Sequence, residues 1–193
     1  MWRNFSLNDE AGTLICTYPE GTHVPAIPIP YCEETMTGFE YALAGLMIHQ
    51  GFVSEGERMV KAIRDRFDGE KRNPWNEFEC GSNYARSMAS FALLPIYSGF
   101  SFDMTKKHVG FAPITDQGRF LFSVAESWGE VSIEETRCRL QILGDPLTLS
   151  SLSIPHPETI RRVTADGTEI AFFLKDGALH WNTVSICKEL CLE

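Results

Sequence analysis

The sequence predicts an α+β protein, with helices in the first half of the chain and strands in the second. Between residues 35 and 97, apolar residues recur every three or four positions, which is the period of an amphipathic helix. After about residue 100 they alternate instead, which is the period of a half-buried strand. The change falls near residues 113–118, so we expect a helical region at 1–113 and a β-rich region at 114–193.

The composition excludes several classes of protein. The chain has 193 residues, of which 44% are hydrophobic and 22% charged, as in an ordinary globular protein. Its net charge of −9 argues against nucleic-acid binding, which needs basic patches. No run of about 18 apolar residues occurs, and residues 1–10 contain no apolar core of a signal peptide. We therefore expect neither a membrane span nor a secretory signal.

The cysteines and histidines are scattered and predict no metal or cofactor. No Cys-x-x-Cys pair occurs, and Cys187-x-x-x-Cys191 lacks the second half of a zinc site. No glycine-rich nucleotide motif is present. Cysteines spaced in this way are typical of buried thiols in a reducing compartment, so a cytoplasmic location is expected, with a secreted, disulfide-bonded chain as the alternative. The six are Cys16, Cys32, Cys80, Cys138, Cys187 and Cys191.

The first region contains three expected helices. Residues 35–50 form the first, capped by Thr35 or Thr37 and ended by Gly51. Residues 54–67 form the second, with a capping box of Ser54 and Glu57. The apolar faces of these two helices are expected to comprise Phe39, Leu43, Leu46 and Met47 in the first, and Met59, Val60, Ile63 and Phe67 in the second.

The third helix is expected at residues 82–97, with Pro95 kinking or fraying its last turn. Before the first helix, residues 13–18 predict a short strand, and four prolines between 19 and 30 then predict a loop. Three helices with one apolar stripe each do not close a core, so we expect them to belong to a larger helical assembly. The face of the third helix is expected to comprise Tyr84, Met88, Phe91, and Leu94 or Pro95.

The second region predicts a strand-rich meander or half of a β-sandwich. Turn signals separate the alternating segments at Gly144-Asp145-Pro146, Asp166-Gly167 and Asp176-Gly177. The last two are strong hairpin signals, because both turn positions favour a positive φ. The expected strands lie at 120–124, 138–142, 147–154, 169–174 and 179–186.

Residues 72–86, RNPWNEFECGSNYAR, form the most distinctive stretch of the sequence. Asn73-Pro74 and Gly81 predict turns before the third helix. Charged residues that bracket the rings of Trp75 and Tyr84 suit a polar ligand with an apolar face, such as a sugar. The alternative is a charged turn whose aromatic rings cover a neighbouring core. The charged residues are Arg72, Glu77, Glu79 and Arg86.

This stretch resembles a block of glycoside hydrolase family 116, which contains β-glucosidases and the non-lysosomal glucosylceramidase. Several motifs carry the resemblance in the family's order, over about residues 12–113. They are Glu34-Thr35-Met36-Thr37-Gly38-Phe39-Glu40-Tyr41, Arg64-Asp65-Arg66-Phe67-Asp68-Gly69, Asn73-Pro74-Trp75-Asn76-Glu77, Glu79-Cys80-Gly81, Tyr84-Ala85-Arg86-Ser87-Met88-Ala89-Ser90, Ser98-Gly99-Phe100 and Gly110-Phe111-Ala112-Pro113.

The resemblance implies an incomplete form of the family's architecture. Members join a β-sandwich to a catalytic toroid of six α-hairpins and hydrolyse β-glycosides with retention. The reaction needs a nucleophile and an acid/base carboxylate about 5–5.5 Å apart. In the family both lie upstream of the block found here, so the resemblance implies about three helices of the toroid and no catalytic residue in this chain.

What the resemblance does place here are sugar-positioning residues. The family's glutamate and arginine that bind the hydroxyls of the innermost glucose fall on Glu77 and Arg86, and Glu34 is a further hydroxyl ligand. Met36 stands where an aromatic often stacks on the sugar, which leaves the sugar preference open. The alternative for Glu77 and Arg86 is a structural salt bridge.

Three hypotheses follow. In the first, the chain is the C-terminal portion of a family 116-like retaining β-glycosidase, binds a β-glucoside and needs a partner chain or the missing upstream part for catalysis. In the second, it is a non-catalytic carbohydrate-binding or interaction module derived from that family. In the third, it is a fragment whose exposed helix faces make it oligomerise.

Overall fold

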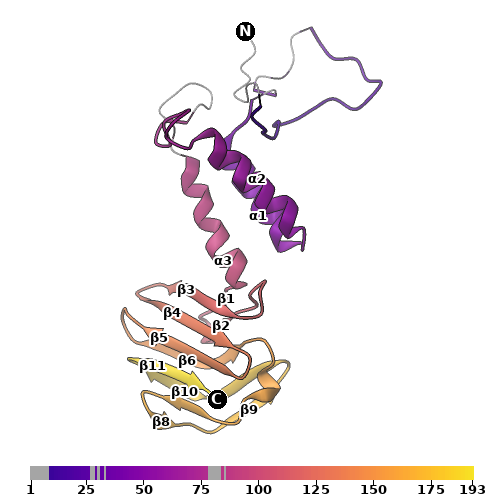
Figure 1. The fold of residues 1–193 in the computed structure, drawn as a ribbon. Helices are drawn as coiled ribbons and strands as arrows, with labels where there is room; N and C mark the ends of the chain where they lie inside the picture. The colour runs from indigo at the N-terminus through magenta and orange to yellow at the C-terminus, as the bar shows by residue number, and fades with distance from the viewer. Residues whose placement is uncertain (1–8, 27–28, 30, 33, 78–83, 85) are drawn as a thin grey trace. The chain divides into compact units, whose positions relative to one another are not determined.

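The computed structural model describes residues 9–26, 29, 31–32, 34–77, 84 and 86–193. The chain divides into two compact units, residues 1–93 and 94–193. This division lies earlier than the expected boundary after residue 113, because two strands before that point already pair within the second unit. The helical first unit and the strand-rich second unit agree with the α+β class (Figure 1).

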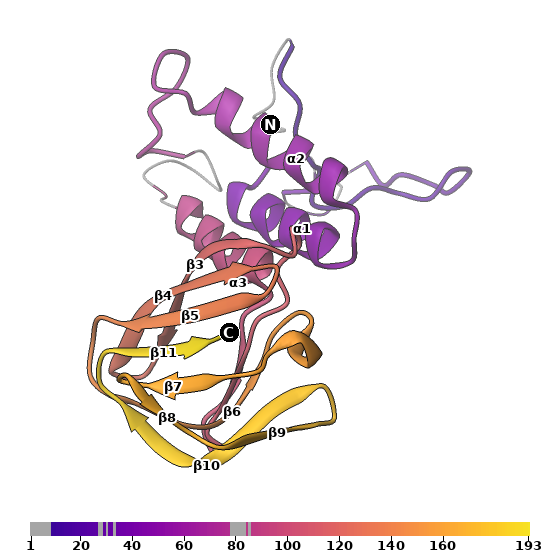
Figure 2. The same cartoon turned by 60° about the horizontal axis from the view of Figure 1, so that its bottom comes forward.

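Two helices, α1 (Thr37–His49) and α2 (Val53–Arg66), lie side by side in the first unit (Figures 1 and 2). Gly51, with a φ of +89°, follows the C-cap of α1 and ends this helix as expected. Among the residues that the structure describes, no helix is long and apolar enough to cross a membrane.

The expected N-terminal caps of both helices are wrong. Met36 and Phe52 occupy the N-cap positions, and neither makes a side-chain cap hydrogen bond. Thr37 is already the first helical residue of α1, and Ser54 lies inside the first turn of α2. Both side chains therefore come too late in the helix to accept the hydrogen bonds that an N-cap accepts.

The expected apolar face of α1 is also wrong, since it lies on the solvent side. Phe39, Leu43 and Leu46 are 62%, 39% and 56% exposed. The opposite face is buried because Gly56 of α2 lets the helices approach closely. A Cβ at Gly56 would lie 2.5 Å from the Ile48 side chain. The residues of α1 that are buried are Thr37, Glu40, Tyr41, Ala44, Gly45 and Ile48.

A buried ion pair joins the two helices to the segment that precedes them. Arg66 of α2 pairs with Glu40 of α1, and both side chains are at most 3% exposed. Glu40 Oε1 also accepts from the Thr13 N–H at 2.9 Å, and Arg66 Nη1 donates to the Ala11 carbonyl at 2.5 Å. The strand expected at 13–18 does not form. Within these residues the structure shows one isolated β-bridge, between Leu14 and Thr35.

The third expected helix is a 3₁₀-helix, η1 (Arg86–Ala92), followed by a short α-helix, α3 (Leu93–Ser98). Ser82, Asn83 and Ala85, at its expected start, lie outside the described residues. Pro95 lacks an N–H and its ring crowds the carbonyl four residues earlier, which favours 3₁₀ geometry before it. The predicted disturbance therefore lies before the proline, and α3 continues to Ser98.

The second unit is a sandwich of two sheets rather than a half sandwich or a meander. Only β2 and β6 pair in parallel among the described strands. In spatial order, one sheet contains β1 (Ser101–Asp103), β2 (His108–Gly110), β6 (Leu147–Ser153), β10 (Ala178–Ile186) and β9 (Phe172–Lys175). The other contains β3 (Gly118–Val124), β4 (Ser127–Glu134), β5 (Arg137–Ile142), β11 (Glu189–Leu192), β7 (Val163–Ala165) and β8 (Thr168–Glu169).

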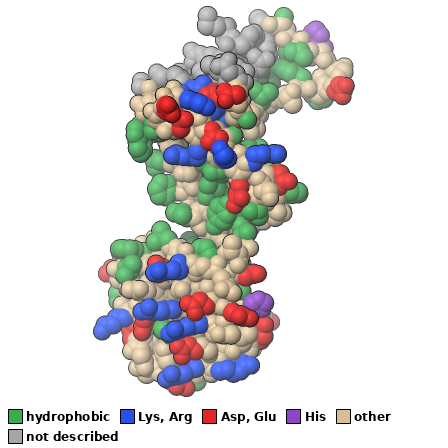
Figure 3. Space-filling view, in the orientation of Figure 1, with side chains coloured by type: hydrophobic (Ala, Val, Ile, Leu, Met, Phe, Trp, Pro, Cys, Tyr) green, Lys and Arg blue, Asp and Glu red, His purple; other side chains and the backbone are tan. Residues whose placement is uncertain are grey.

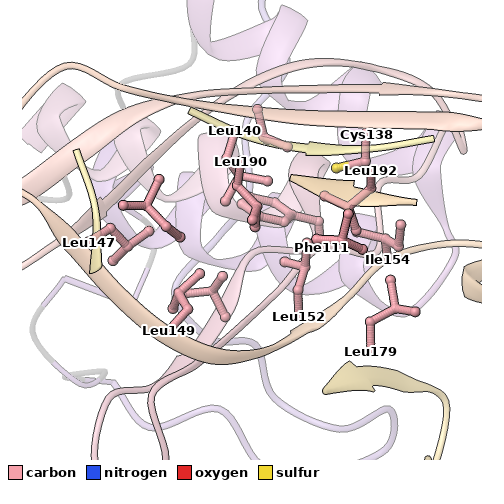
Figure 4. Close-up of a cluster of buried hydrophobic side chains, with 14 of the residues drawn as sticks. Phe111, Cys138, Leu140, Leu147, Leu149, Leu152, Ile154, Leu179, Leu190 and Leu192 are labelled. Atoms are coloured by element: carbon pink, nitrogen blue, oxygen red, sulfur yellow. The ribbon is translucent and has the colours of Figure 1, made fainter. Parts of the chain in front are cut away.

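The core of the second unit lies between the two sheets. Leu140 and Leu190 come from the six-stranded sheet, and Leu149, Leu152 and Leu179 come from the five-stranded sheet. All five are 0% exposed, and their side chains lie in one cluster (Figure 4). Burial of alternate residues from facing sheets is the packing expected of a β-sandwich.

The turns of the second unit follow the sequence signals, but one expected strand does not. Asp166-Gly167 joins β7 to β8 and Asp176-Gly177 joins β9 to β10, and all four residues have positive φ, as type I′ hairpins need. The strand expected at 169–174 is instead two strands, β8 and β9, in different sheets. The chain passes from one sheet to the other between them. A 3₁₀ turn, η2 (Pro157–Thr159), precedes β7.

Candidate functional site

The first turn of α1 and the start of η1 lie together in the first unit, although they are far apart in sequence. A Cβ at Gly38 would lie 3.3 Å from Cβ of Arg86. Glycine at position 38 therefore leaves room for the arginine stem against the first turn of α1. The contact brings the Glu34–Gly38 segment, which the sequence singled out, next to Arg86.

Glu77 is buried, and its carboxylate holds the first residues of η1. Oε2 accepts from the Arg86 N–H and Oε1 from the Ser87 N–H, both at 2.8 Å. The Glu77 N–H donates to the Tyr84 carbonyl at 2.9 Å. A carboxylate on the first N–H groups of a helix satisfies donors that have no partner within the helix. Glu77, which is 1% exposed, therefore fixes the position of Arg86 through its backbone.

Arg86 is the exposed member of the predicted set. Its guanidinium carbon lies 5.1 Å from the centre of the Tyr84 ring, which is cation–π geometry. A stacked guanidinium keeps its N–H donors around the rim of the plane, where they can reach the hydroxyls of a ligand. The carboxylate of Glu77 is linked to Arg86 through the backbone N–H of residue 86.

Glu34 lies inside the first unit. It is 2% exposed, and the three residues after it are also buried, with exposures of 3%, 5% and 2% for Thr35, Met36 and Thr37. The Thr37 hydroxyl is buried without a hydrogen-bond partner in the described part of the chain. The structure therefore brings the Glu34 segment and Arg86 to the same end of α1, but it buries the two glutamates and exposes only the arginine.

Tyr41 is a neighbour of this site that the sequence reasoning missed. Burial raises the pKa of its phenol, a hydrogen bond and the charge of Arg64 oppose this, and the carboxylates of Glu77 and Glu40 raise it further. The phenol therefore stays protonated and available as a donor among carboxylates. The one signal in the sequence is helical spacing. Tyr41 lies four residues after Thr37 and three before Ala44, and all three lie on the buried face of α1.

The remaining residues of the distinctive stretch are structural or remote. Trp75 is 81% exposed, so its ring covers no core. The backbone N–H of Trp75 donates to Asn73 Oδ1 at 2.9 Å in the expected turn. Arg72 forms an ion pair with Glu10 at 2.6 Å, and its guanidinium lies 5.9 Å from the centre of the Phe67 ring. Glu79, Cys80 and Gly81 lie outside the described residues.

The arrangement can orient a polyol but holds no assembled acid/base pair facing solvent in the residues described. One guanidinium presents donors, and buried hydroxyl, phenol and carboxylate groups lie behind it. Among these residues, no group of three or more His, Cys, Asp or Glu side chains is placed to hold a metal ion. No protein-family model matches the sequence, and no curated protein is significantly similar to it.

Proposed function

We propose that this chain is the C-terminal portion of a family 116-like retaining β-glycosidase, of the β-glucosidase type, and that it contributes sugar-binding residues. The observation that carries the proposal is the meeting of the Glu34–Gly38 segment with Arg86 at one end of α1. In the proposal, the nucleophile and the acid/base come from another part of the protein or from a partner chain.

The residues have distinct roles in this proposal. Arg86, stacked on Tyr84, donates hydrogen bonds to the hydroxyls of a β-glucoside. Glu77 fixes the backbone position of Arg86, because the Glu77 carboxylate accepts a hydrogen bond from the backbone N–H of residue 86. Glu34 lies deeper and supports the same end of α1.

Exposed apolar residues of the first unit support the view that further helices cover it. Phe39 and Leu46 of α1 are 62% and 56% exposed, and Met88 and Phe91 of η1 are 73% and 69% exposed. Hydrophobic side chains are visible on the surface of this unit in Figure 3. Exposed apolar side chains in such number mark an interaction surface, and the remaining hairpins of a toroid would bury them.

Titration of the full chain with glucose, followed by calorimetry, tests the binding role. Arg86→Ala should weaken binding about tenfold or more, because hydrogen bonds from a charged donor are lost. Arg58→Ala, on the exposed surface of α2, is the matched control and should leave binding unchanged. Equal binding by the wild type and Arg86→Ala would refute the site.

The second candidate is a non-catalytic carbohydrate-binding or interaction module. The burial of Glu34 and Glu77 favours it, and so does the second unit, which closes its own core. Mixing the chain with a chain that carries the upstream helices separates the two candidates. Gain of aryl β-glucoside hydrolysis supports the glycosidase, whereas glucose binding without gained hydrolysis supports the module. Turnover by this chain alone would contradict the absence of a catalytic pair.

A further inference from the structure

The outer face of the six-stranded sheet carries a polar hollow of 360 Å³ in the second unit. Strands β3, β4 and β5 form its floor, and it is separate from the site around Arg86. Its volume lies within the range of about 300–1,000 Å³ that is common for ligand pockets. Three arginines line it, Arg119, Arg137 and Arg139, together with Ser132, Gln141 and two glutamates.

The strand register sets these side chains in rows across the sheet. Ser132 of β4 lies opposite Arg119 of β3 on one side and Arg139 of β5 on the other. In the next row, Glu130 of β4 lies between Leu121 of β3 and Gln141 of β5. Polar groups therefore recur at the spacing of neighbouring strands, about 4.8 Å, beside one apolar side chain. This regular spacing suits a chain of repeating units better than a single small ion.

Ion pairs hold the arginines in place. Arg119 binds Glu130 through Nε and Nη2 at 2.9 and 2.6 Å, and Arg139 binds Glu189 in the same way at 2.9 and 2.7 Å. Arg137 pairs with Glu193 at 3.1 Å. Exposed pairs of this kind add little to stability. They do fix side chains that would otherwise lose rotamer freedom when a ligand binds.

The charge balance of the hollow identifies the class of ligand. Glu130 and Glu134 line the hollow with the three arginines, and Glu189 and Glu193, outside the lining, neutralise Arg139 and Arg137 as their ion-pair partners. Figure 3 shows side chains of both signs on the visible face of this unit. A phosphate or nucleic-acid site needs an excess of positive charge, which is absent here. Guanidinium donors next to carboxylate, amide and hydroxyl acceptors instead match a neutral ligand with many hydroxyls.

We propose that this face is a second carbohydrate site, which binds a neutral β-linked chain of glucose units that crosses strands β3–β5. The choice of glucose rests on the proposed function, whereas the preference for a neutral polyol rests on the hollow itself. Trp128 adds an apolar border. It lies on β4 two residues before Glu130, on the same face of the sheet, and it is 47% exposed. An indole beside the polar hollow suits the apolar face of a sugar ring.

The test is a titration of the full ¹⁵N-labelled chain with cellotetraose, followed by amide chemical shifts. Shifts are expected in β3, β4 and β5. Gln141→Ala should raise the Kd about fivefold, and the double variant Ser132→Ala/Gln141→Ala about twentyfold or more, as one or two hydrogen bonds are lost. Asn182→Ala, exposed on the other sheet, is the control and should leave the Kd unchanged.

Two further measurements complete the test. Binding of a neutral chain should change little over about a tenfold range of NaCl concentration, whereas an anionic ligand would lose affinity steeply. Arg86→Ala should leave the chemical-shift changes in β3–β5 intact. A failure of glucose binding at Arg86 can therefore be distinguished from a failure of binding at β3–β5. Absence of shifts in β3–β5 at millimolar cellotetraose, or equal Kd for the wild type and the double variant, would overturn the proposal.

Discussion

The two units of this protein differ in the charged side chains that they bury. In the second unit, alternate apolar residues of two sheets fill the core, and the ion pairs lie on the surface. In the first unit, Glu40, Arg66 and Glu77 are at most 3% exposed, while Phe39 and Met88 are 62% and 73% exposed. The second unit therefore has the core of an independent domain. The first depends on buried polar contacts and leaves apolar surface uncovered.

This difference teaches where the stability of each unit resides. A buried ion pair contributes little net stability when it is intact, but its disruption is costly because one charge stays buried alone. An apolar core contributes in proportion to the area that it buries. We therefore expect the two units to respond differently to the same kind of substitution, and four measurements test this expectation.

The largest effect is expected for Arg66→Met, which leaves the Glu40 carboxylate buried without its ion-pair partner. The first unit should lose about 3–5 kcal/mol, enough to unfold a marginal unit. Far-ultraviolet circular dichroism of the helices during urea unfolding measures this loss. The double variant Glu40→Leu/Arg66→Met removes both charges and should recover much of it. Equal instability of the single and double variants would contradict the importance of the pair.

The next effect is expected in the second unit. Leu190→Ala opens a cavity at a position that is 0% exposed and should cost about 2–5 kcal/mol. Leu46→Ala, at an exposed position of α1, is the matched control and should change stability by less than about 0.5 kcal/mol. Fluorescence of the buried Trp181 follows the unfolding of the sandwich, and far-ultraviolet circular dichroism of the helices follows that of α1. A large loss for Leu46→Ala would show that α1 packs through the face that is exposed here.

A smaller effect is expected for Glu77→Gln. The amide NH₂ cannot accept from an N–H group, so one of the two bonds to the start of η1 is lost and the other loses its charge. Helical stability should fall by about 1–2 kcal/mol. Glu55→Gln, in the exposed first turn of α2, is the control. No difference between the two variants would show that Glu77 does not hold η1.

The smallest effect concerns pH and the five-stranded sheet. Burial lowers the pKa of His108, the charges of His180 and Lys106 lower it further, and Asp103 opposes them. His108 Nδ1 lies 2.8 Å from the Ser151 hydroxyl. Because the folded state favours the neutral ring, the unfolded chain takes up the proton first as the pH falls below about 6.5. Stability of the sandwich should be full above that pH and decrease as the pH falls toward the lower pKa of the folded state.

His108→Gln tests this prediction by removing the titrating ring. The drop in urea midpoint between about pH 7.5 and about pH 5.5 should shrink in this variant. His23→Gln, at an exposed position of the first unit, should keep the drop of the wild type. An undiminished drop in His108→Gln would assign the pH dependence to other groups.

The sequence predicted where helices and strands lie better than it predicted which faces of them are buried. The positions of α1, α2 and several strands were predicted correctly, as were the hairpins at Asp166-Gly167 and Asp176-Gly177, because these signals are local. The buried face of α1 could not be read, since Gly56 of α2 decides it from another helix. Strands β1, β2, β4, β7 and β11 were missed. Four of them are too short for an alternating pattern, and the buried positions of β4 include Ser127 and Gly129, which interrupt its apolar alternation.

The candidate site was predicted in part. The segments of Glu34 and Arg86 do meet, but no local pattern indicates that Glu77 binds two backbone N–H groups rather than facing solvent. The role of Tyr41 depends on Arg64, Glu40 and Glu77 at once, which is a property of the packed structure. Residue type alone therefore does not indicate which way these side chains point.

Asp166 illustrates a consequence of such packing for the evolution of the sandwich. Its carboxylate accepts from the N–H groups of Cys187, Lys188 and Glu189 at 2.8, 2.7 and 3.0 Å, while its own φ of 49° makes the β7–β8 turn. One side chain thus fastens two turns that are distant in sequence. An insertion into the link between β10 and β11 would detach that carboxylate, so we expect natural length variation to avoid this link and to collect in loops that no distant residue ties down.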